Sequence, residues 1–511
     1  MTYGRNAITP ISLTPVRSWP VSSFSLAFGI LAAVTIVRLI GLHFSVVDLF
    51  FDESQYWAWS RELAFGYVSK PPLLAWIVAA ADHVCGDSEA CIRAPMPLLY
   101  FGTSLIVYAI ARELYDAPVA FFAALSIGLA TGTAFSARII STDVPLLLFW
   151  ALALLAYLKL LAGGGWRWTL TLGVALGLGL LAKYAMVYFL LGIALAAWLD
   201  RDARRLLRTP SLWLALAIAL LLLAPNIVWN IQNGFATLRE TGNNIQGEGV
   251  KINILRALEF VGSQFGVFGP ILFYVLLVAM VRLASPAINR ADRLMLAFAV
   301  PPLALITAVG TVTHANANWA AVSFVSGTVV AVALLVRGEA WKWLAASLAL
   351  GVVVQIGLLV CDTVATQVHV PFLANGDLYY RTLGWRSFAE QTGQLARRVG
   401  ARTIVGDIHY EVSSLLYYWR DQPEQILAWR ERPIPEDNFE LTRPFTATAP
   451  QPILYVTTCT KRKLPLSDFF ASVEPLGSIV APSGPTKAHY YLAFKLAEPR
   501  GPVNPRGECE E

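Results

Sequence analysis

Long apolar runs constrain this chain more than any other feature of its sequence. A helix that crosses a membrane needs roughly 20 consecutive, predominantly apolar residues. About eleven segments meet that requirement. They cover residues 22–43, 94–112, 117–136, 144–162, 166–182, 184–199, 211–229, 262–282, 293–312, 317–336 and 341–361. The first segment is too long for a signal-peptide core and has no small-residue cleavage site, so we expect an uncleaved signal anchor.

Composition supports a membrane protein rather than a soluble one. The 511 residues are 56% hydrophobic and 14% charged, whereas about 25% of a soluble domain is charged. Residues 362–511 differ from the rest, because proline and charged residues are spread throughout them. We therefore predict a transmembrane domain over residues 1–361, including an outer loop at 44–93, and a separate soluble domain over 362–511.

The soluble domain has an α/β pattern. Residues 386–399 have helical spacing of apolar positions, and three short runs are typical of strands. These runs are 403–406, 453–456 and 490–494. The predicted fold class is thus a polytopic α-helical membrane protein with a C-terminal α/β domain.

The basic residues indicate the orientation of the spans. The net charge is only +5, but a cluster of arginines that includes Arg204, Arg205 and Arg208 follows the sixth span. Short loops rich in Lys and Arg favour the cytoplasmic side. With the N-terminus inside, eleven spans place the C-terminal domain outside. We expect no nucleic-acid partner, because the chain has no basic stripe.

The outer loop at 44–93 contains two cysteines, Cys85 and Cys91. An oxidising compartment would permit a disulfide between them, and two free thiols fit the spacing equally well. Tyr56 and its aromatic neighbours predict a helix lying in the membrane interface. The short apolar run at 73–84 is expected to be interfacial or re-entrant.

Several ionisable or polar side chains share the predicted outer face. Ionisable groups in or beside spanning segments are candidates for function. They are Asp52, Glu53, Lys70, Arg138, Asp143, Lys183, His314 and, with them, Asn318. A carboxylate can act as a general base toward a hydroxyl, and Lys or Arg can hold a phosphate. We therefore expect an active site that opens at the membrane surface.

Each candidate also has a structural explanation. Asp52 and Glu53 could cap an interfacial helix, and an acidic residue is ordinary at a helix start such as Asp143. The basic candidates could be anchors in the interface. His314 and Asn318 could cap a helix. Their shared face is what favours a functional interpretation.

The motifs resemble those of the GT-C membrane glycosyltransferases. The resemblance rests on Phe51 to Tyr56, Ser69 to Leu73, Gly86 to Glu89 and Ser141 to Asp143, and it covers about residues 20–360. The aminoarabinose transferase of lipid A and the galacturonosyl transferases of lipopolysaccharide are the most similar subgroup. Protein O-mannosyltransferases are more distant. Since members have about a dozen spans, we expect eleven to thirteen.

The resemblance implies an inverting transfer of a sugar from a polyprenyl-phosphate donor on the periplasmic side. It gives Asp52 the role of the carboxylate that activates the acceptor, and Asp143 that of a second acidic residue. Lys70 corresponds to a residue that holds the donor phosphate, and the role of Glu53 stays open.

Other candidate contacts are weaker. Arg138 and Lys183 are candidates for the donor phosphate, and Tyr56, His314 and Asn318 for substrate binding. No cofactor is required by this chemistry, although a divalent cation between acidic residues is compatible with it.

The resemblance and composition together predict a multi-pass protein of the bacterial inner membrane whose C-terminal domain is periplasmic. The expected acceptor is an envelope glycolipid such as lipid A or lipopolysaccharide core. The main alternative is a transporter or flippase of a lipid-linked saccharide, although no internal repeat of the kind common in transporters is visible. A membrane scaffold without catalysis is a third interpretation. The residues do not identify the sugar or the oligomeric state.

Overall fold

The computed structural model describes residues 23–246, 252–371, 376–430, 434–459 and 466–500. The chain forms two compact units. We call the first the helical unit, which comprises Met1–Leu39, Met96–Gln232 and Gly242–Gly357. The second, the mixed unit, comprises Ile40–Pro95, Asn233–Thr241 and Leu358–Glu511. Much of the predicted outer loop thus groups with the C-terminal residues, and the predicted domain boundary at residue 361 stays a prediction.

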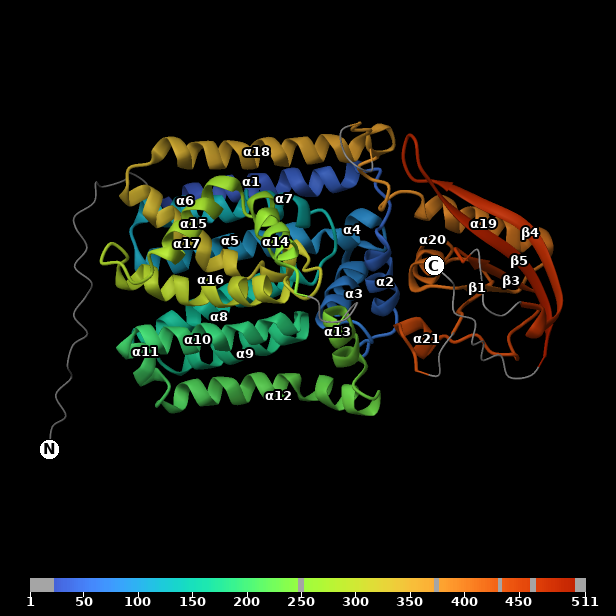
Figure 1. Cartoon of the computed structure of the whole chain (residues 1–511), viewed down its shortest axis with the longest axis horizontal. Coiled ribbons are helices and arrows are strands. Elements are labelled where there is room, and N and C mark those ends of the chain that lie inside the picture. Colours follow the sequence, from blue (N-terminus) through green and yellow to red (C-terminus); the bar gives the residue numbers. More distant parts are fainter. Residues whose placement is uncertain (1–22, 247–251, 372–375, 431–433, 460–465, 501–511) are drawn as a thin grey trace. The chain divides into compact units, whose positions relative to one another are not determined.

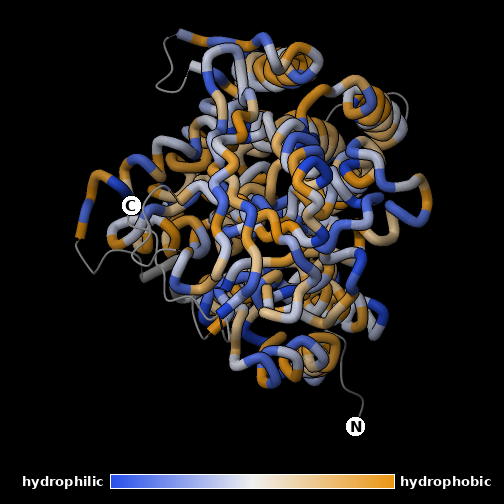
Figure 2. The backbone as a smooth tube through the Cα atoms, turned by 90° about the vertical axis from the view of Figure 1, so that its right-hand side faces the viewer, coloured by the Kyte–Doolittle hydropathy of each residue, from blue (hydrophilic) through white to orange (hydrophobic). Residues whose placement is uncertain are grey.

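The helical unit consists of long apolar helices and short connecting ones (Figure 1). Hydropathy along the backbone can be followed in Figure 2. Its elements are α1 (Ser23–Phe44), α5 (Pro95–Leu114), α6 (Ala117–Gly128), α7 (Thr131–Ser136), α8 (Asp143–Leu161), α9 (Trp166–Ala182), η1 (Tyr184–Val187), α10 (Tyr188–Leu199), α11 (Arg201–Leu206), α12 (Pro210–Gln232), α14 (Ile254–Val267), α15 (Pro270–Val281), α16 (Arg290–Val309), η2 (Ala317–Ala320), α17 (Ser323–Arg337) and α18 (Trp341–Thr363), with α13 (Ala236–Gln246) starting in the mixed unit.

Within the described residues, six helices are long and apolar enough to cross a membrane. They are Ser23–Phe44, Glu89–Leu114, Asp143–Leu161, Pro210–Gln232, Arg290–Val309 and Trp341–Thr363. Shorter apolar helices of 10–17 residues accompany them, among them α6, α9, α15 and α17. The chain is therefore an α-helical membrane protein, and the expected count of eleven to thirteen spans is not confirmed.

Two segments expected to be continuous are broken. The predicted span at 262–282 contains the end of α14 at Val267 and the start of α15 at Pro270. Between them Gly269 has a φ of +94°, a conformation that glycine adopts without steric cost, and proline is favoured at the first position of a helix. The predicted span at 117–136 likewise divides into α6 and α7.

Small residues let two helices of this unit approach closely. A Cβ atom on Gly173 of α9 would lie 2.7 Å from the carbonyl oxygen of Ala215 in α12, and one on Gly177 would lie 2.8 Å from a methyl carbon of Leu222. Close packing of this kind is a main source of helix association in lipid, where apolar side chains gain nothing by avoiding the bilayer. The pairing of α9 with α12 therefore depends on these glycines.

The mixed unit combines short helices with a five-stranded sheet. Its elements are α2 (Phe51–Ser60), α3 (Leu73–Cys85), α4 (Glu89–Arg93), η3 (Ala365–Gln367), α19 (Trp385–Val399), β1 (Thr403–Gly406), α20 (His409–Tyr418), β2 (Gln425–Ala428), α21 (Asn438–Thr442), β3 (Ile453–Thr457), η4 (Leu466–Asp468), β4 (Phe470–Pro482) and β5 (Ala488–Pro499). The predicted helix and all three predicted strands of this region are confirmed to within a few residues, whereas β2, β4, α20 and α21 were not predicted.

The strand order of the sheet is β2-β1-β3-β5-β4. β1 pairs in parallel with both β2 and β3, so Ile404 lies opposite Ile426 on one side and Leu454 on the other. β5 runs antiparallel to β3 and β4. All four residues of β1 are buried, as is typical of parallel strands covered on both faces.

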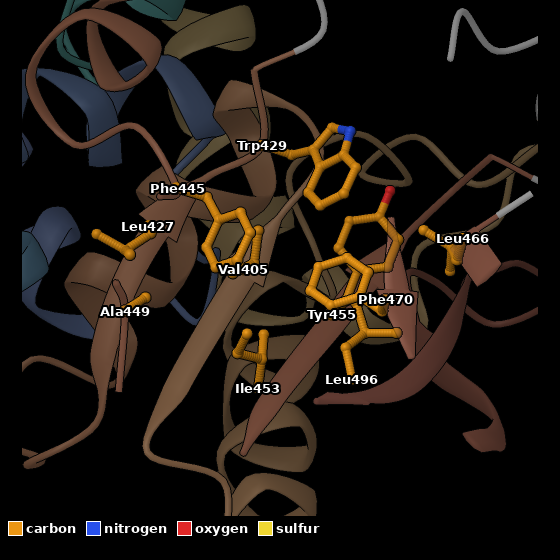
Figure 3. Packing of buried hydrophobic residues seen from close by; sticks show 10 residues of the cluster. All are labelled: Val405, Leu427, Trp429, Phe445, Ala449, Ile453, Tyr455, Leu466, Phe470 and Leu496. Carbon is orange, nitrogen blue, oxygen red and sulfur yellow. The ribbon is translucent and has the colours of Figure 1, made fainter. Parts of the chain in front are cut away.

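An aromatic cluster fills the core on one face of this sheet. The rings of Trp429, Phe445, Tyr455 and Phe470 gather above the strands (Figure 3). The ring centroids of Trp429 and Tyr455 are 4.9 Å apart. Such contacts add to the hydrophobic stabilisation from burial, and they give the end of β1 a rigid support.

Candidate active site

The first turn of α2 presents the acidic pair predicted from the sequence. Helix α2 begins at Phe51, so Asp52 and Glu53 both lie in its first turn, where the helix dipole favours negative charge. Glu53 Oε2 accepts a hydrogen bond of 2.9 Å from the backbone N–H of Phe50. Glu53 therefore does cap the helix, as the structural explanation expected.

Glu53 also forms a buried ion pair with Arg93. The Arg93 Nε and Nη2 atoms donate to the two Glu53 carboxylate oxygens at 2.8 and 2.7 Å. Arg93 further donates to the carbonyl oxygens of Val47 and Asp48 at 3.0 and 2.8 Å. The side chains of Glu53 and Arg93 are only 1% and 3% exposed. These contacts favour a role for Glu53 in holding α2, and its predicted catalytic role stays untested.

Asp52 differs from every other carboxylate of residues 44–93. Within the described residues its side chain makes no hydrogen bond and no ion pair, although it is largely buried. The other six acidic side chains of this segment are all engaged. Their partners are Gly384 N for Asp48, Arg93 for Glu53, Arg443 for Glu62, Arg61 for Asp82, Arg420 for Asp87, and Arg386 for Glu89. Asp52 is thus the one acid of the segment whose lone pairs are available to a substrate.

The surroundings of Asp52 adjust its basicity. Burial raises the pKa of Asp52 above its ordinary value, because the charged form loses contact with water. The positive neighbours Lys70 and His409 act in the opposite direction on this pKa. Glu53 adds to the rise, and Arg381 lowers it. A carboxylate with a raised pKa is a better general base near neutral pH than an exposed one.

Lys70 is held by the chain around it. Its carbonyl oxygen accepts a hydrogen bond of 3.2 Å from the Tyr67 N–H. The next two residues, Pro71 and Pro72, are buried and lead into α3, and proline limits the backbone to few conformations.

Tyr56 is buried with its ring edge-on to Trp59 at 5.4 Å, so it packs in the core of the mixed unit.

Three predicted residues meet in the helical unit. Asp143 begins α8, and its side chain is buried. The Lys183 Nζ atom lies 2.6 Å from Asp143 Oδ1, and Asn318 Nδ2 donates to Asp143 Oδ2 at 2.6 Å. Lys183 occupies the extended link between α9 and η1, and Asn318 lies in η2. Segments far apart in sequence therefore converge on one carboxylate.

The remaining predicted residues are less engaged with this cluster. Arg138 is buried, and its guanidinium lies 5.5 Å from the ring of Phe135. His314 is exposed in the segment before η2, and no contact joins it to Asp143. Their predicted roles in phosphate and substrate binding stay predictions.

A polar network in the mixed unit joins the outer loop at 44–93 to the described residues after α18, which we call the sheet domain. Asp48 Oδ2 accepts hydrogen bonds from the backbone N–H groups of Gly384 and Arg386 at 2.9 and 3.3 Å. Glu89 accepts from Arg386 at 2.8 Å and from the hydroxyl of Tyr418 at 2.6 Å. Burial, together with the negative charge of Glu89, raises the pKa of Asp48 to about 6.

Sequence reasoning missed Arg93, Arg381 and His409. Arg93 lies at the end of α4, and the other two lie more than 300 residues from Asp52 along the chain. The only signal for Arg93 was a lone basic residue at the start of an apolar span. Nothing in the sequence pairs Arg381 or His409 with the acidic loop, because only the tertiary fold brings them together.

The two loop cysteines form a disulfide. Cys85 at the end of α3 and Cys91 in α4 are bonded, with their Cα atoms 5.8 Å apart, so the structure decides between the two interpretations left open by the spacing. Among the described residues, no group of three or more His, Cys, Asp or Glu side chains is placed to hold a metal ion. The prediction that no cofactor is required stays a prediction.

Comparison with known proteins identifies relatives of this chain. Residues 69–229 match the model of the dolichyl-phosphate-mannose-protein mannosyltransferase family. Lipid A galacturonosyltransferase RgtD of Rhizobium johnstonii is 33% identical over 430 residues, which are 84% of this chain and 90% of RgtD. Lipopolysaccharide core galacturonosyltransferase RgtA of the same organism is 28% identical over 181 residues, 35% of this chain and 36% of RgtA.

A solved structure shares the fold over nearly the whole chain. ArnT from Cupriavidus metallidurans, crystallised bound to undecaprenyl phosphate, superimposes with a TM-score of 0.65 at 15% identity. The match covers 93% of this chain and 98% of ArnT. The identity to RgtD over most of both chains, together with this shared fold, shows the family. The chain therefore belongs to the GT-C family of membrane glycosyltransferases that includes lipid A galacturonosyltransferase RgtD, and it is a glycosyltransferase.

Proposed function

We propose that this enzyme transfers a galacturonic acid residue from a polyprenyl-phosphate donor to lipid A, with inversion at the anomeric carbon. The observation that carries the proposal is the carboxylate of Asp52, the one acid of residues 44–93 that makes no hydrogen bond or ion pair with the described residues. The sugar and the acceptor follow from the similarity to RgtD, and the lipid carrier follows from the shared fold with ArnT.

In the proposed reaction Asp52 accepts the proton of the acceptor hydroxyl. The hydroxyl oxygen bonds to the anomeric carbon as the bond between that carbon and the phosphate oxygen breaks. The polyprenyl phosphate leaves as a stable anion, so no separate acid is needed to protonate it. Lys70 stabilises the negative charge that develops on the phosphate. We expect no cofactor in this scheme.

We further propose that the mixed unit faces the periplasm of a bacterial inner membrane. Lys and Arg residues of the short loops between helices favour the cytoplasmic side for these loops, which is the side opposite the periplasm. The bonded pair Cys85 and Cys91 lies in this unit, and disulfides persist in oxidising compartments such as the bacterial periplasm. Both observations support the same orientation.

The Asp143 cluster is assigned a supporting role in this proposal. Lys183, held by Asp143 at 2.6 Å, carries a positive charge suited to a lipid phosphate. Arg138 is a further candidate for the same contact. Asn318 fixes the second oxygen of Asp143, so it orients the carboxylate and need not touch a substrate.

The test is deletion of the gene followed by complementation and mass spectrometry of lipid A. Wild type should restore one uronic acid residue that the deletion lacks, and Asp52→Asn should not restore it. The matched control is Asp82→Asn, because Asp82 belongs to the same segment but pairs with Arg61 at the surface, where an ion pair contributes little. Full restoration by Asp52→Asn would refute the catalytic assignment. Accumulation of an intact lipid-linked oligosaccharide in the deletion strain would instead indicate a transporter.

A further inference from the structure

The carboxyl end of β1 is the place in the sheet domain where a ligand is expected. The chain leaves β1 toward β2 on one side and leaves β3 toward β4 on the other, so the connections of these two adjacent parallel strands run in opposite directions. Ligands of open α/β sheets bind outside the carboxyl ends of the strands at such a switch point. The chain leaves β1 at Gly406 and enters α20 at His409. His409 therefore stands at this position.

Helix α20 packs against the start of α2 within the mixed unit. The ring of His409 lies 5.7 Å from the ring of Phe51, and the Ser413 hydroxyl donates to the Phe51 carbonyl oxygen at 3.2 Å. Phe51 directly precedes Asp52. The ring of Tyr410 also contacts Phe51 at 5.4 Å. Aromatic side chains from the sheet domain therefore surround the chain at the candidate base.

Arg381 is the second sheet-domain residue at this place. Its guanidinium lies 5.5 Å from the ring of Phe50, two residues before Asp52. Its side chain is exposed, and among the described residues the guanidinium makes no ion pair and no side-chain hydrogen bond. Several other described arginines of the mixed unit are paired, for example Arg386 with Glu89 and Arg420 with Asp87. A guanidinium that stacks on a ring keeps the hydrogen-bond donors at its edge available.

We propose that Arg381 and His409 form a subsite for an oxyanion carried by the substrate, either the carboxylate of the transferred uronic acid or a phosphate on the acceptor. This inference rests on the proposed function. Like Lys70, both side chains bring positive charge to Asp52. The leaving phosphate occupies Lys70 in the proposed reaction, so Arg381 and His409 serve a second anion.

The subsite also has a consequence for the base. Arg381 and His409 lower the pKa of Asp52 in the free enzyme. A bound oxyanion offsets these positive charges, so the carboxylate becomes more basic when the charged substrate arrives. The carboxylate of a uronic acid can accept two parallel hydrogen bonds from the guanidinium, a geometry that lysine cannot reproduce.

The test compares two donors that share one polyprenyl phosphate, one carrying galacturonic acid and one carrying galactose. Each is assayed with phosphorylated and with dephosphorylated lipid A, using the full-length enzyme in detergent. A charge-assisted hydrogen bond supports a loss of roughly 10- to 100-fold in kcat/KM for Arg381→Gln. Arg381→Lys should recover part of this loss. Arg398→Gln is the control, because Arg398 is an exposed arginine of the same domain at the far end of α19.

The pattern of losses identifies the source of the oxyanion. A loss with galacturonic acid but not with galactose, whichever acceptor is used, assigns the subsite to the sugar carboxylate. A loss that requires the acceptor phosphate, with either donor, assigns it to the acceptor. Equal loss in all four combinations, or no loss, overturns the inference while the wild-type enzyme stays active. Absence of any transfer by the wild-type enzyme would refute the proposed function instead.

Discussion

The buried pair of Glu53 and Arg93 allows a sharp distinction between a structural and a catalytic role for Glu53. Replacing Glu53 with Gln keeps the size of the side chain but removes the charge. Arg93 would then remain a buried cation without its counter-ion. Asp52→Asn serves as the comparison, because it makes the same chemical change one residue earlier in the same helix turn.

The expected size of the effect follows from the burial of the pair. Both side chains are nearly inaccessible to solvent, at 1% and 3% exposed, so water cannot replace the lost partner. Breaking a pair of this kind by removing one charge costs about 3–5 kcal/mol. Glu53→Gln should therefore destabilise the mixed unit by about this amount. Asp52→Asn should change stability little, since among the described residues no hydrogen bond or ion pair of Asp52 is lost and burial of its charge already opposes folding.

A double-mutant cycle with Arg93→Met isolates the interaction. The double variant removes both charges, so its destabilisation should fall short of the sum of the two single effects by about 2 kcal/mol. It should still be less stable than wild type, because the carbonyl oxygens of Val47 and Asp48 lose their donor. Unfolding by denaturant in detergent, followed by tryptophan fluorescence, measures these free energies.

Activity measured on the same samples supplies the refuting result. We expect Glu53→Gln to retain measurable transfer at temperatures where it is folded, and Asp52→Asn to lose transfer while fully folded. If Glu53→Gln has wild-type stability and loses transfer as completely as Asp52→Asn, Glu53 is a catalytic group and the structural interpretation fails.

Three further predictions concern other charged groups. Lys183→Met and Asp143→Asn should each reduce the rate of transfer. The double variant should be no slower than the slower single variant, because the two residues form one ion pair. Initial rates of the three variants check this. Burial raises the pKa of Asp52, so kcat/KM should fall as the pH decreases, with a midpoint above the ordinary pKa of 3.8. Because Lys70 lowers the pKa of Asp52, Lys70→Gln should move this midpoint to higher pH. An unmoved pH profile would contradict the electrostatic assignment. The pKa of Asp48 is raised from 3.8 to about 6, so the folded state binds this proton more tightly and stability should decline as the pH rises between these values. Asp48→Asn should remove a pH dependence of about 2 kcal/mol, read from denaturation curves at pH 4 and 7.

Much of the secondary structure could be predicted from local patterns. Apolar runs of about 20 residues identified α1, α12 and α18, because a span must satisfy its backbone hydrogen bonds within the helix. Strands β1 and β3 were visible as short runs of β-branched residues. The division of 262–282 was missed because hydropathy ignores the break that Gly269 and Pro270 impose.

The candidate site was only partly predictable. The motif resemblance singled out Asp52, Lys70 and Asp143. In the described part of the chain Asp52 makes no hydrogen bond or ion pair, and Asp143 pairs with Lys183. Residue chemistry alone could not separate Asp52 from Glu53, since the two carboxylates are adjacent and chemically alike; only the resemblance favoured Asp52. The separation depends on Arg93, which binds one of them and leaves the other free.

The sequence by itself determined that the chain is a membrane protein with an α/β domain, because hydrophobic length and periodicity act over neighbouring residues. Only the tertiary structure decided which charges are neutralised and which remain available. Arg381 and His409 reach the start of α2 through folding of the sheet domain within the mixed unit. Electrostatic interactions depend on distance in space and on burial, and neither quantity can be read from separation along the chain.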